Sequence, residues 1–438
     1  ARHRPHTGMQ RPPTNPLLRF STPDPAPFAT DSSLTVYSSG GYAGHAFPIH
    51  RYQRADGSWR FVGWAMRGAS WWRPRTARDD APARQRLTHV GRASWPGGAS
   101  AWTEDDYWAP ELHRVRGHAG PRWKHGSVHS DTLLQPHSAV LVSVALLLTS
   151  RPWCMHGAGR LLLFYTARRR DGTLCIGVAA SASNLPTGPF ADALGQPLLC
   201  RPDGAIDPHV FIDRRGDDAT PHLLWKDDSN ARGARTTIFL QRLRADGLGL
   251  EGAPKPLLSN DPAGWEGPLV EAPWLVLDTS SVPHYYFLFY SANAFNGPKY
   301  AVGVARATSL AGPYVKRGAP ILRTSRNASA SPFAGPGHCA VVGAPGAGKA
   351  LLFYHAWQRD PRARARKAAA GRRLMVSGVS YGRGAGRWPA VGERGVPHVS
   401  VGGVRTWVER LWLGNRTRRG SARIGTHRPG RQRVMRMV

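Results

Sequence analysis

The feature that most constrains this 438-residue chain is a β-rich unit that its sequence repeats. One copy, residues 109–190, contains APELHRV, LLLFYTA and LCIGVAASASNLPTGPF; another, residues 270–314, contains VEAPWLV, YYFLFYSANAF and YAVGVARATSLAGPY. Both place an acidic residue beside Ala-Pro, then an aromatic-rich run, a run of small residues and a Gly-Pro-aromatic turn. A repeat of this size indicates one supersecondary unit that is used several times.

Weaker copies begin at Asp24-Pro, at Asp207-Pro and at Gly337-His338, which brings the total to about five units. Each unit has short apolar runs separated by Gly, Pro, Asn and Asp, and no helical period of 3.6 residues is sustained. The pattern predicts an all-β fold, a five-bladed β-propeller with its blades arranged radially around an axis.

Three regions lie outside the repeat. We expect residues 15–395 to form the propeller, after an irregular segment at 1–14 and before a basic, disordered tail at 396–438. Residues 117–159 interrupt the second blade, and their apolar run is too short to span a bilayer. Our hypothesis is that this insert is a retained intron or a similar gene-model artefact; the alternative is a real apolar loop over the rim.

The repeat also predicts where chemistry is located. The first strand of each blade lines the axis of a propeller, so the residues that head the units should converge at one mouth of the channel: Asp24, Glu111, Asp207, Glu271 and His338. Carboxylates on one small surface repel one another and cost desolvation. A glycosidase has a use for them, because it needs two or three such groups held at different pKa values.

Several motifs occur in a fixed order with blade-sized spacing: NPLL and PDPAPF, YWAPELH, IDPHVFID, WEGPLVEAPWLV, FYSAN, GPGH and FYHAW. In this order they resemble glycoside hydrolase family 43, the five-bladed arabinanases, α-L-arabinofuranosidases and β-xylosidases. The resemblance covers roughly residues 15–115 and 160–392. It implies an inverting hydrolase that requires no cofactor, with a structural calcium or sodium ion on the propeller axis.

The resemblance implies a role for each matching position. Asp24 matches the general base that activates water, Glu271 the general acid that protonates the leaving oxygen, and Asp207 the residue that orients the acid and tunes its pKa. His338 matches the axial histidine that contacts substrate or, through water, the ion. One histidine alone does not make a metal site.

Further residues have weaker assignments. Trp108 is expected to form a pocket wall, Ser291 of FYSAN to contact substrate, and Glu111 to hold local structure or a substrate hydroxyl. Glu266, in WEGP, competes with Glu271 for the role of acid, but its loop position favours a structural or rim role. Asp-Pro also opens ordinary turns, so an isolated Asp24 would be read as a turn residue.

The formal net charge of +31 ordinarily points toward nucleic acid, but the arginines are scattered, as GC-rich coding produces, and no nucleic-acid motif is present. We expect no nucleic-acid partner, no membrane, a monomer, and a substrate of arabinose- or xylose-containing oligosaccharide or polysaccharide. No β-sandwich carbohydrate-binding module is recognisable after the propeller in the sequence, which slightly favours arabinose-containing substrates over xylose-containing ones.

The four cysteines show no zinc spacing, and Cys200 could approach Cys175 within one blade. The family implies extracellular action or the secretory pathway, although the chain shows no signal peptide. Two alternatives differ in class: a non-catalytic sugar-binding propeller, and an inactive product of a faulty gene model. A related fructan-cleaving enzyme would need Asn-Asp-Pro, and here Pro23 precedes Asp24.

Overall fold

The computed structural model describes most of the predicted propeller and none of the flanking regions. It describes residues 21–30, 33–39, 41–42, 45–53, 58–66, 103–116, 159–169, 171–213, 215, 219–280, 282–327, 331–343, 350–359, 371–382 and 386–392. The predicted segment 1–14, residues 117–158 of the predicted insert, and the predicted tail 396–438 lie outside these residues.

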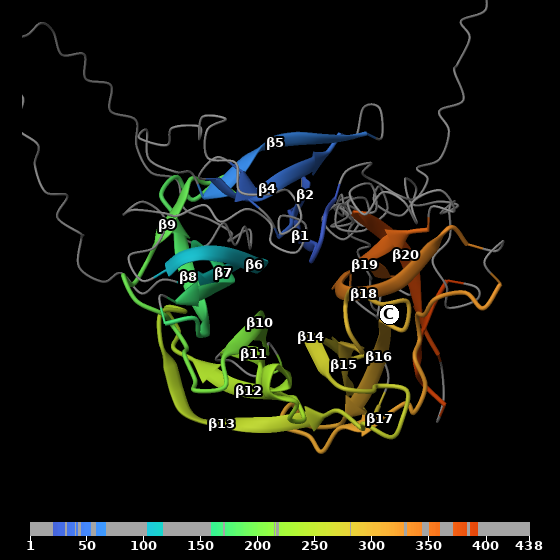
Figure 1. The fold of residues 1–438 in the computed structure, drawn as a ribbon. Coiled ribbons are helices and arrows are strands. Elements are labelled where there is room, and N and C mark those ends of the chain that lie inside the picture. Colours follow the sequence, from blue (N-terminus) through green and yellow to red (C-terminus); the bar gives the residue numbers. More distant parts are fainter. Residues whose placement is uncertain are drawn as a thin grey trace, which may run out of the picture.

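The described residues form β-sheets that stand in a ring around a centre (Figure 1). One sheet has nine strands: β1 (Ala26–Ala29), β2 (Leu34–Tyr37), β3 (Gly41–Tyr42), β4 (His45–Tyr52), β5 (Trp59–Met66), β6 (Thr103–Arg116), β7 (Gly159–Arg169), β8 (Leu174–Ser181) and β9 (Phe190–Asp192). Its strand order is β1-β2-β4-β5-β9-β8-β7-β6, with β3 beside β4. A single parallel pair, Met66 with Phe190, joins its two halves, and every other pairing in it is antiparallel.

Three further sheets have four antiparallel strands each, in chain order. They are β10 (Ala205–Ile212), β11 (Pro221–Asp227), β12 (Thr237–Leu243) and β13 (Leu250–Ser259); β14 (Val270–Asp278), β15 (Tyr285–Ala292), β16 (Ala301–Ala307) and β17 (Val315–Lys316); and β18 (Phe333–Val342), β19 (Ala350–Gln358), β20 (Arg372–Tyr381) and β21 (Pro389–Val391). The all-β prediction is therefore confirmed.

Helix is almost absent from the described chain. The one described helix is a 3₁₀ turn, η1 (Ser229–Arg232), in the connection between β11 and β12. Among these residues no helix has the length and apolar character that crossing a bilayer requires.

The strands nearest the centre of the ring in Figure 1 are β1, β6, β10, β14 and β18, and later strands of each sheet lie farther out. The inner strands are largely buried; in β14, for example, most side chains are inaccessible to solvent. Four of these strands contain the motifs that head the repeats, and the Asp24-Pro25 motif directly precedes β1, so the fold brings those motifs to the axis.

A tyrosine at the end of the second strand packs on a glycine of the third strand in both strong copies. Tyr165 lies opposite Gly177, and Tyr290 lies opposite Gly303. A Cβ atom on Gly303 would stand 2.6 Å from Cζ of Tyr290 and 2.7 Å from the Trp265 ring. The small residues of the third run are therefore needed because the aromatic rings of the second run occupy the space above them.

Side-chain packing joins the first and last parts of the ring. One apolar cluster unites residues of both parts: Leu34, Val36, Tyr52, Leu351, Phe353, Leu374 and Val376. The amide of Thr22 also donates a hydrogen bond to the carbonyl of Arg372 at 2.6 Å. The last sheet contains only β18–β21, so in the described chain no strand of the N-terminal part is paired into it.

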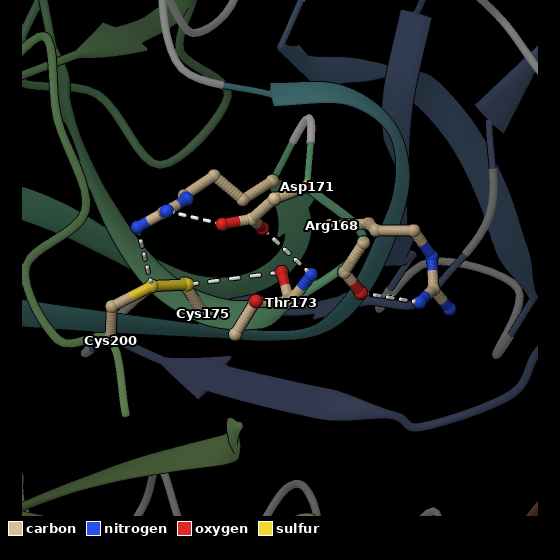
Figure 2. Close-up of a disulfide and its surroundings, with 7 residues drawn as sticks. Arg168, Asp171, Thr173, Cys175 and Cys200 are labelled. Atoms are coloured by element: carbon tan, nitrogen blue, oxygen red, sulfur yellow. Dashed lines mark hydrogen bonds and ion pairs between the residues drawn. A yellow bond between two sulfur atoms is a disulfide. The ribbon is translucent and has the colours of Figure 1, made fainter. Parts of the chain in front are cut away.

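A disulfide joins Cys175 of β8 to Cys200, which follows the short strand β9 and its loop. Figure 2 shows this bond beneath the turn that links β7 to β8, where Asp171 accepts hydrogen bonds from Arg169 and from the amide of Thr173. The predicted approach of Cys200 to Cys175 is confirmed. Cys339 is a free, buried thiol.

Gly303→Ala should lower the free energy of unfolding by about 1–3 kcal/mol, because the added methyl group overpacks the contact with Tyr290. Urea unfolding measures this change. Gly386→Ala is the matched control, since a Cβ atom there meets no atom within 4 Å. Equal stability of the two variants would contradict the packing argument.

Removing the disulfide by Cys175→Ser with Cys200→Ser should lower the free energy of unfolding by about 2–4 kcal/mol, because the unfolded chain regains the freedom of the closed loop. Thermal unfolding with and without a reducing agent tests this. The reductant should lower the melting temperature of the natural chain and leave that of the double variant unchanged.

Candidate active site

A sharp bend at one residue in the left-handed region occurs in each of β6, β10, β14 and β18, and in the segment just before β1. The residues are Asp24 (φ 51°), Ala109 (φ 45°), Asp207 (φ 57°), Ala272 (φ 51°) and His338 (φ 49°). In β6, β10, β14 and β18 the strand pairing also shifts register at this point, which marks a β-bulge. Bulges re-aim side chains, and strained backbone of this kind is concentrated at functional sites.

The positions of the bends show how the repeats should be aligned with one another, and this alignment differs from the one that the sequence motifs suggest. Asp24, Asp207 and His338 stand at the bend itself, whereas Glu271 stands one residue before it and Glu111 two residues after it. The five residues that head the units are therefore not at equivalent positions. The two glutamates consequently differ in their surroundings.

The amide at each bend donates a hydrogen bond to a side chain of a neighbouring sheet or half-sheet. The pairs are Asp24 N to His355 Nδ1 (3.2 Å), Ala109 N to Ser39 Oγ (2.8 Å), Asp207 N to Thr166 Oγ1 (3.0 Å), Ala272 N to Asp207 Oδ2 (3.0 Å) and His338 N to Ser291 Oγ (2.8 Å). These bonds satisfy buried amides that have left the strand pairing.

The bond from Ala272 differs from the others in its acceptor. In the repeat, Lys226 of LLWKDD follows the aromatic residue as Thr166, Ser291 and His355 do in their copies. An ammonium group has no lone pair to accept a hydrogen bond, and the carboxylate of Asp207 accepts it instead. This bond holds Asp207 beside the backbone of the residue that follows Glu271.

The ammonium group of Lys226 lies close to Glu271. Nζ stands 3.9 Å from Oε2 of Glu271, 3.1 Å from Asp228 and 2.6 Å from the amide oxygen of Asn230. The side chain is only 1% exposed. A buried cation therefore borders the glutamate on one side.

Asp24 is surrounded by groups that favour its ionised form. Arg372 Nη1 lies 3.0 Å from Oδ1, His338 Nδ1 lies 3.3 Å from it, and Ser39 Oγ donates to Oδ2 at 2.5 Å. Burial alone would raise the pKa of Asp24, but the neighbouring Arg372 and His338 outweigh it and hold that pKa well below its usual range. Asp24 is thus a carboxylate at neutral pH.

The surroundings of Glu271, unlike those of Asp24, favour its protonated form. Its carboxyl is buried, and Oε1 accepts a hydrogen bond from the hydroxyl of Tyr300 at 2.6 Å. Burial, followed by the charge of Asp207, raises the pKa of Glu271 to about 7, although Lys226 acts against the shift. Below that pH the group carries a proton, and above it the proton is lost.

Asp207 couples the other two carboxyls. Burial raises its pKa and the charge of Asp24 adds to the shift, while His338 and Lys226 act against it. His338 influences the pKa of Asp24, of Asp207 and of Glu271. The structure therefore brings together these three predicted carboxyls with His338 among them.

A small cavity of about 20 Å³ lies on the axis beside this group. Residues from all the inner strands line it, among them Asp207, His338, Glu111 and Trp274. The cavity shows that the inner strands leave room next to Asp207 for about one water molecule.

The other predicted residues have different surroundings. Ser291 is fully buried and its hydroxyl accepts the bend amide of His338, so it positions that residue. Glu266 is buried and bonds to Tyr290 and Lys316, which agrees with a structural role. Trp108 lies in β6, but its side chain is outside the described part of the structure.

Glu111 is buried and paired with two imidazoles. Its Oε1 contacts His113 Nε2 and lies 2.7 Å from His209 Nδ1. Burial would raise its pKa, but His209 and His113 hold the pKa at about 2. These contacts fit the predicted role in local structure.

His338 does not present the ligands of a hard cation. Its described neighbour is Asp24, and no group of three ligating side chains found among the described residues includes it. Ca²⁺ takes six to eight oxygen ligands. The axial ion stays a prediction.

Four residues of the site were not anticipated: Lys226, Tyr300, His355 and Arg372. The repeat contained the signal for Lys226 and His355, because both follow the aromatic residue of their copy. Nothing distinguishes Arg372 from the other basic residues, since the chain has 59 lysines and arginines.

Comparison with known proteins places this geometry in a family. The sequence profile of glycosyl hydrolases family 43 matches residues 151–383. A β-D-galactofuranosidase, xynD, of Aspergillus niger is 29% identical over 196 residues, which are 43% of this chain and 49% of that protein. The chain thus spans about half the length of this relative.

Solved structures share the fold. A thermostable family-43 glycoside hydrolase has a TM-score of 0.58 at 21% identity, over 86% of this chain and 95% of its own. A xylan β-1,4-xylosidase of Bacillus halodurans has a TM-score of 0.56 at 19% identity, over 89% and 58%. An α-L-arabinofuranosidase of Lactobacillus brevis has a TM-score of 0.54 at 17% identity, over 89% and 96%. With these neighbours, the ring of sheets is a propeller.

The proton on Glu271 can be observed directly. The infrared spectrum of the natural chain minus that of Glu271→Gln should show a carboxylic acid band that disappears as pH rises through about 7. Lys226→Met should move the midpoint to higher pH, because it removes a cation that stabilises the ionised form. Lys255→Met, on the exposed strand β13, is the control. A midpoint near the ordinary glutamate value in the natural chain would contradict the assignment.

Proposed function

The chain belongs to glycosyl hydrolases family 43 and is a glycosidase, and from this premise we propose that it hydrolyses α-L-arabinofuranosyl or β-D-xylosyl linkages with inversion. The substrates would be arabinose- or xylose-containing oligosaccharides or polysaccharides of plant cell walls. We propose that the enzyme acts as a monomer, without nucleic-acid or membrane partners.

One observation carries the proposal. Two carboxyls that are linked through Asp207 differ in protonation at neutral pH. Asp24, whose charge acts on Asp207, is ionised, and Glu271, on which the charge of Asp207 acts, holds a proton below about 7. Glycoside hydrolysis needs such a pair, one group to give a proton and one to take it. A buried structural cluster would gain nothing from this difference.

In the proposed reaction, Glu271 transfers its proton to the glycosidic oxygen while the bond from that oxygen to the anomeric carbon breaks. Asp24 takes a proton from the water that forms the new bond to this carbon on the opposite face. Tyr300 donates to Oε1 of Glu271, so Oε2 is the oxygen left to carry the transferable proton. Exchange with solvent afterwards moves a proton from Asp24 back to Glu271.

Asp207 and Lys226 act on the acid from opposite sides. The negative charge of Asp207 keeps the proton on Glu271, and the positive charge of Lys226 limits how high the pKa rises. A general acid works best when its pKa lies near the operating pH. We propose that this balance sets the pH range of the enzyme.

We propose five blades, counting the two halves of the nine-stranded sheet separately because only Met66–Phe190 pairs them. The disulfide supports an oxidising compartment, and therefore the expected extracellular or secretory location.

A second substrate has support from the A. niger relative, whose name is that of a β-D-galactofuranosidase. Galactofuranose and arabinofuranose share a five-membered ring and differ in the length of the exocyclic chain. A site that holds one can therefore hold the other if it leaves room beyond the ring.

Purified protein assayed on p-nitrophenyl α-L-arabinofuranoside, β-D-xyloside and β-D-galactofuranoside distinguishes these substrates. Proton NMR of the first product formed should show the anomer of inverted configuration. Retention of configuration would overturn the roles of Asp24 and Glu271. Sugar binding without turnover would favour the non-catalytic propeller, and failure to fold would favour a faulty gene product.

Glu271→Gln should lower kcat by about 10²–10⁴-fold on oligosaccharides and much less on p-nitrophenyl glycosides, because an activated aryl leaving group needs little protonation. Steady-state kinetics on both substrates measures the difference. Glu251→Gln, an exposed site on β13, is the matched control. An equal loss on both substrates would count against Glu271 as the acid.

A further inference from the structure

A second group of chemically reactive side chains lies on the inner strands, apart from Asp24 and Glu271. Glu111 and His113 come from β6 and His209 comes from β10. One ligand atom from each lies within 4.8 Å of the others. Residues two apart on a strand face the same side, which explains why Glu111 and His113 act together.

The cluster is buried where it meets the core and open on one side. Glu111 is 4% and His209 3% exposed, whereas the side chain of His113 is 21% exposed. Glu111 also borders the axial cavity. Solvent and small ions therefore have a route to it.

The hydrogen bonds inside the cluster leave one carboxylate oxygen of Glu111 unused. His113 Nε2, His209 Nδ1 and the amide of Val210 all converge on Oε1 of Glu111. Among the described residues no hydrogen bond reaches Oε2 of Glu111. Buried polar atoms normally find partners, so this unused oxygen, beside two imidazole nitrogens that converge on the same carboxylate, points to a missing ligand.

We propose that Glu111, His113 and His209 bind one divalent transition-metal ion, for which Zn²⁺ is the best match. Two imidazoles and a carboxylate are a recurrent ligand set for zinc with an open fourth position. Imidazole also favours Zn²⁺, Cu²⁺, Ni²⁺ and Fe²⁺ over Ca²⁺, which requires oxygen ligands. The fourth position would be taken by water.

The ion fits with small side-chain movements. Zinc–ligand bonds of about 2.0–2.2 Å hold ligand atoms about 3–4 Å apart. The three ligand atoms here lie within 4.8 Å of one another, and His209 Nδ1 stands 2.7 Å from Oε1, so the imidazoles would have to move back from this oxygen to admit the ion. The ion would replace the hydrogen bonds that now join the imidazoles to Oε1. The ring of Trp274, 4.3 Å from that of His209 between centroids, limits how far this histidine turns.

The bound ion would cross-link two sheets. β6 belongs to the nine-stranded sheet and β10 begins the next one, with no strand pairing between them. His209 is also two residues from Asp207 on β10. An ion that binds the folded chain and not the unfolded chain stabilises the fold, so it should raise the melting temperature.

The experiment uses Co²⁺ as a spectroscopic substitute for zinc. The full chain is stripped with EDTA, dialysed and titrated with Co²⁺ while visible absorption and thermal unfolding are recorded. We expect one site per chain with ligand-field absorption, displacement by Zn²⁺, a higher melting temperature, and no such effect of Ca²⁺. His113→Asn should weaken binding at least about tenfold, and His284→Asn, at a histidine in the turn between β14 and β15, should leave it unchanged.

A ligand exchange keeps the test decisive if His113→Asn folds poorly. His113→Cys should retain the site and add a sulfur-to-cobalt charge-transfer band, which His284→Cys should lack. Absence of a Co²⁺ site in the natural chain, equal binding by the natural chain and His113→Asn, or stabilisation by Ca²⁺ in place of Zn²⁺ would each overturn the proposal.

Discussion

The structure depends on how the bent inner strands satisfy their backbone amides. A β-bulge removes an amide from the strand pairing, and a buried amide without a partner destabilises the fold. Here a side chain from a neighbouring sheet accepts each of these bonds, so strands distant in sequence are held together at the axis. The constraint that fixes the backbone therefore also fixes the side chains at the bends.

One exception to this scheme produces the chemistry. Lys226 cannot accept the amide of Ala272, and Asp207 accepts it instead. Both the carboxylate of Asp207 and the ammonium group of Lys226 then act on Glu271, whose pKa burial and the charge of Asp207 raise. Arg372 and His338 instead hold Asp24 ionised. The residues proposed as acid and base thus differ because of burial and of the charges that neighbouring sheets supply.

Sequence patterns predicted much of this arrangement. The repeat predicted the all-β ring, and the motifs placed Asp207, Glu271 and His338 on its inner strands and Asp24 just before one of them. The repeat could not align these residues correctly, because a bulge shifts side chains by one or two positions and leaves no mark in an apolar pattern. Glu111 was therefore grouped with the carboxyls, although it pairs with His113 and His209.

What the sequence determined by itself is the period of the strands and the residue types at their inner ends, because both depend on local alternation and local motifs. Only the tertiary structure decided which charges stand beside which carboxyl. Asp24 and Arg372 are 348 residues apart in the chain, and their contact exists only because the ring closes. A pKa depends on distances between groups, and the fold alone sets those distances.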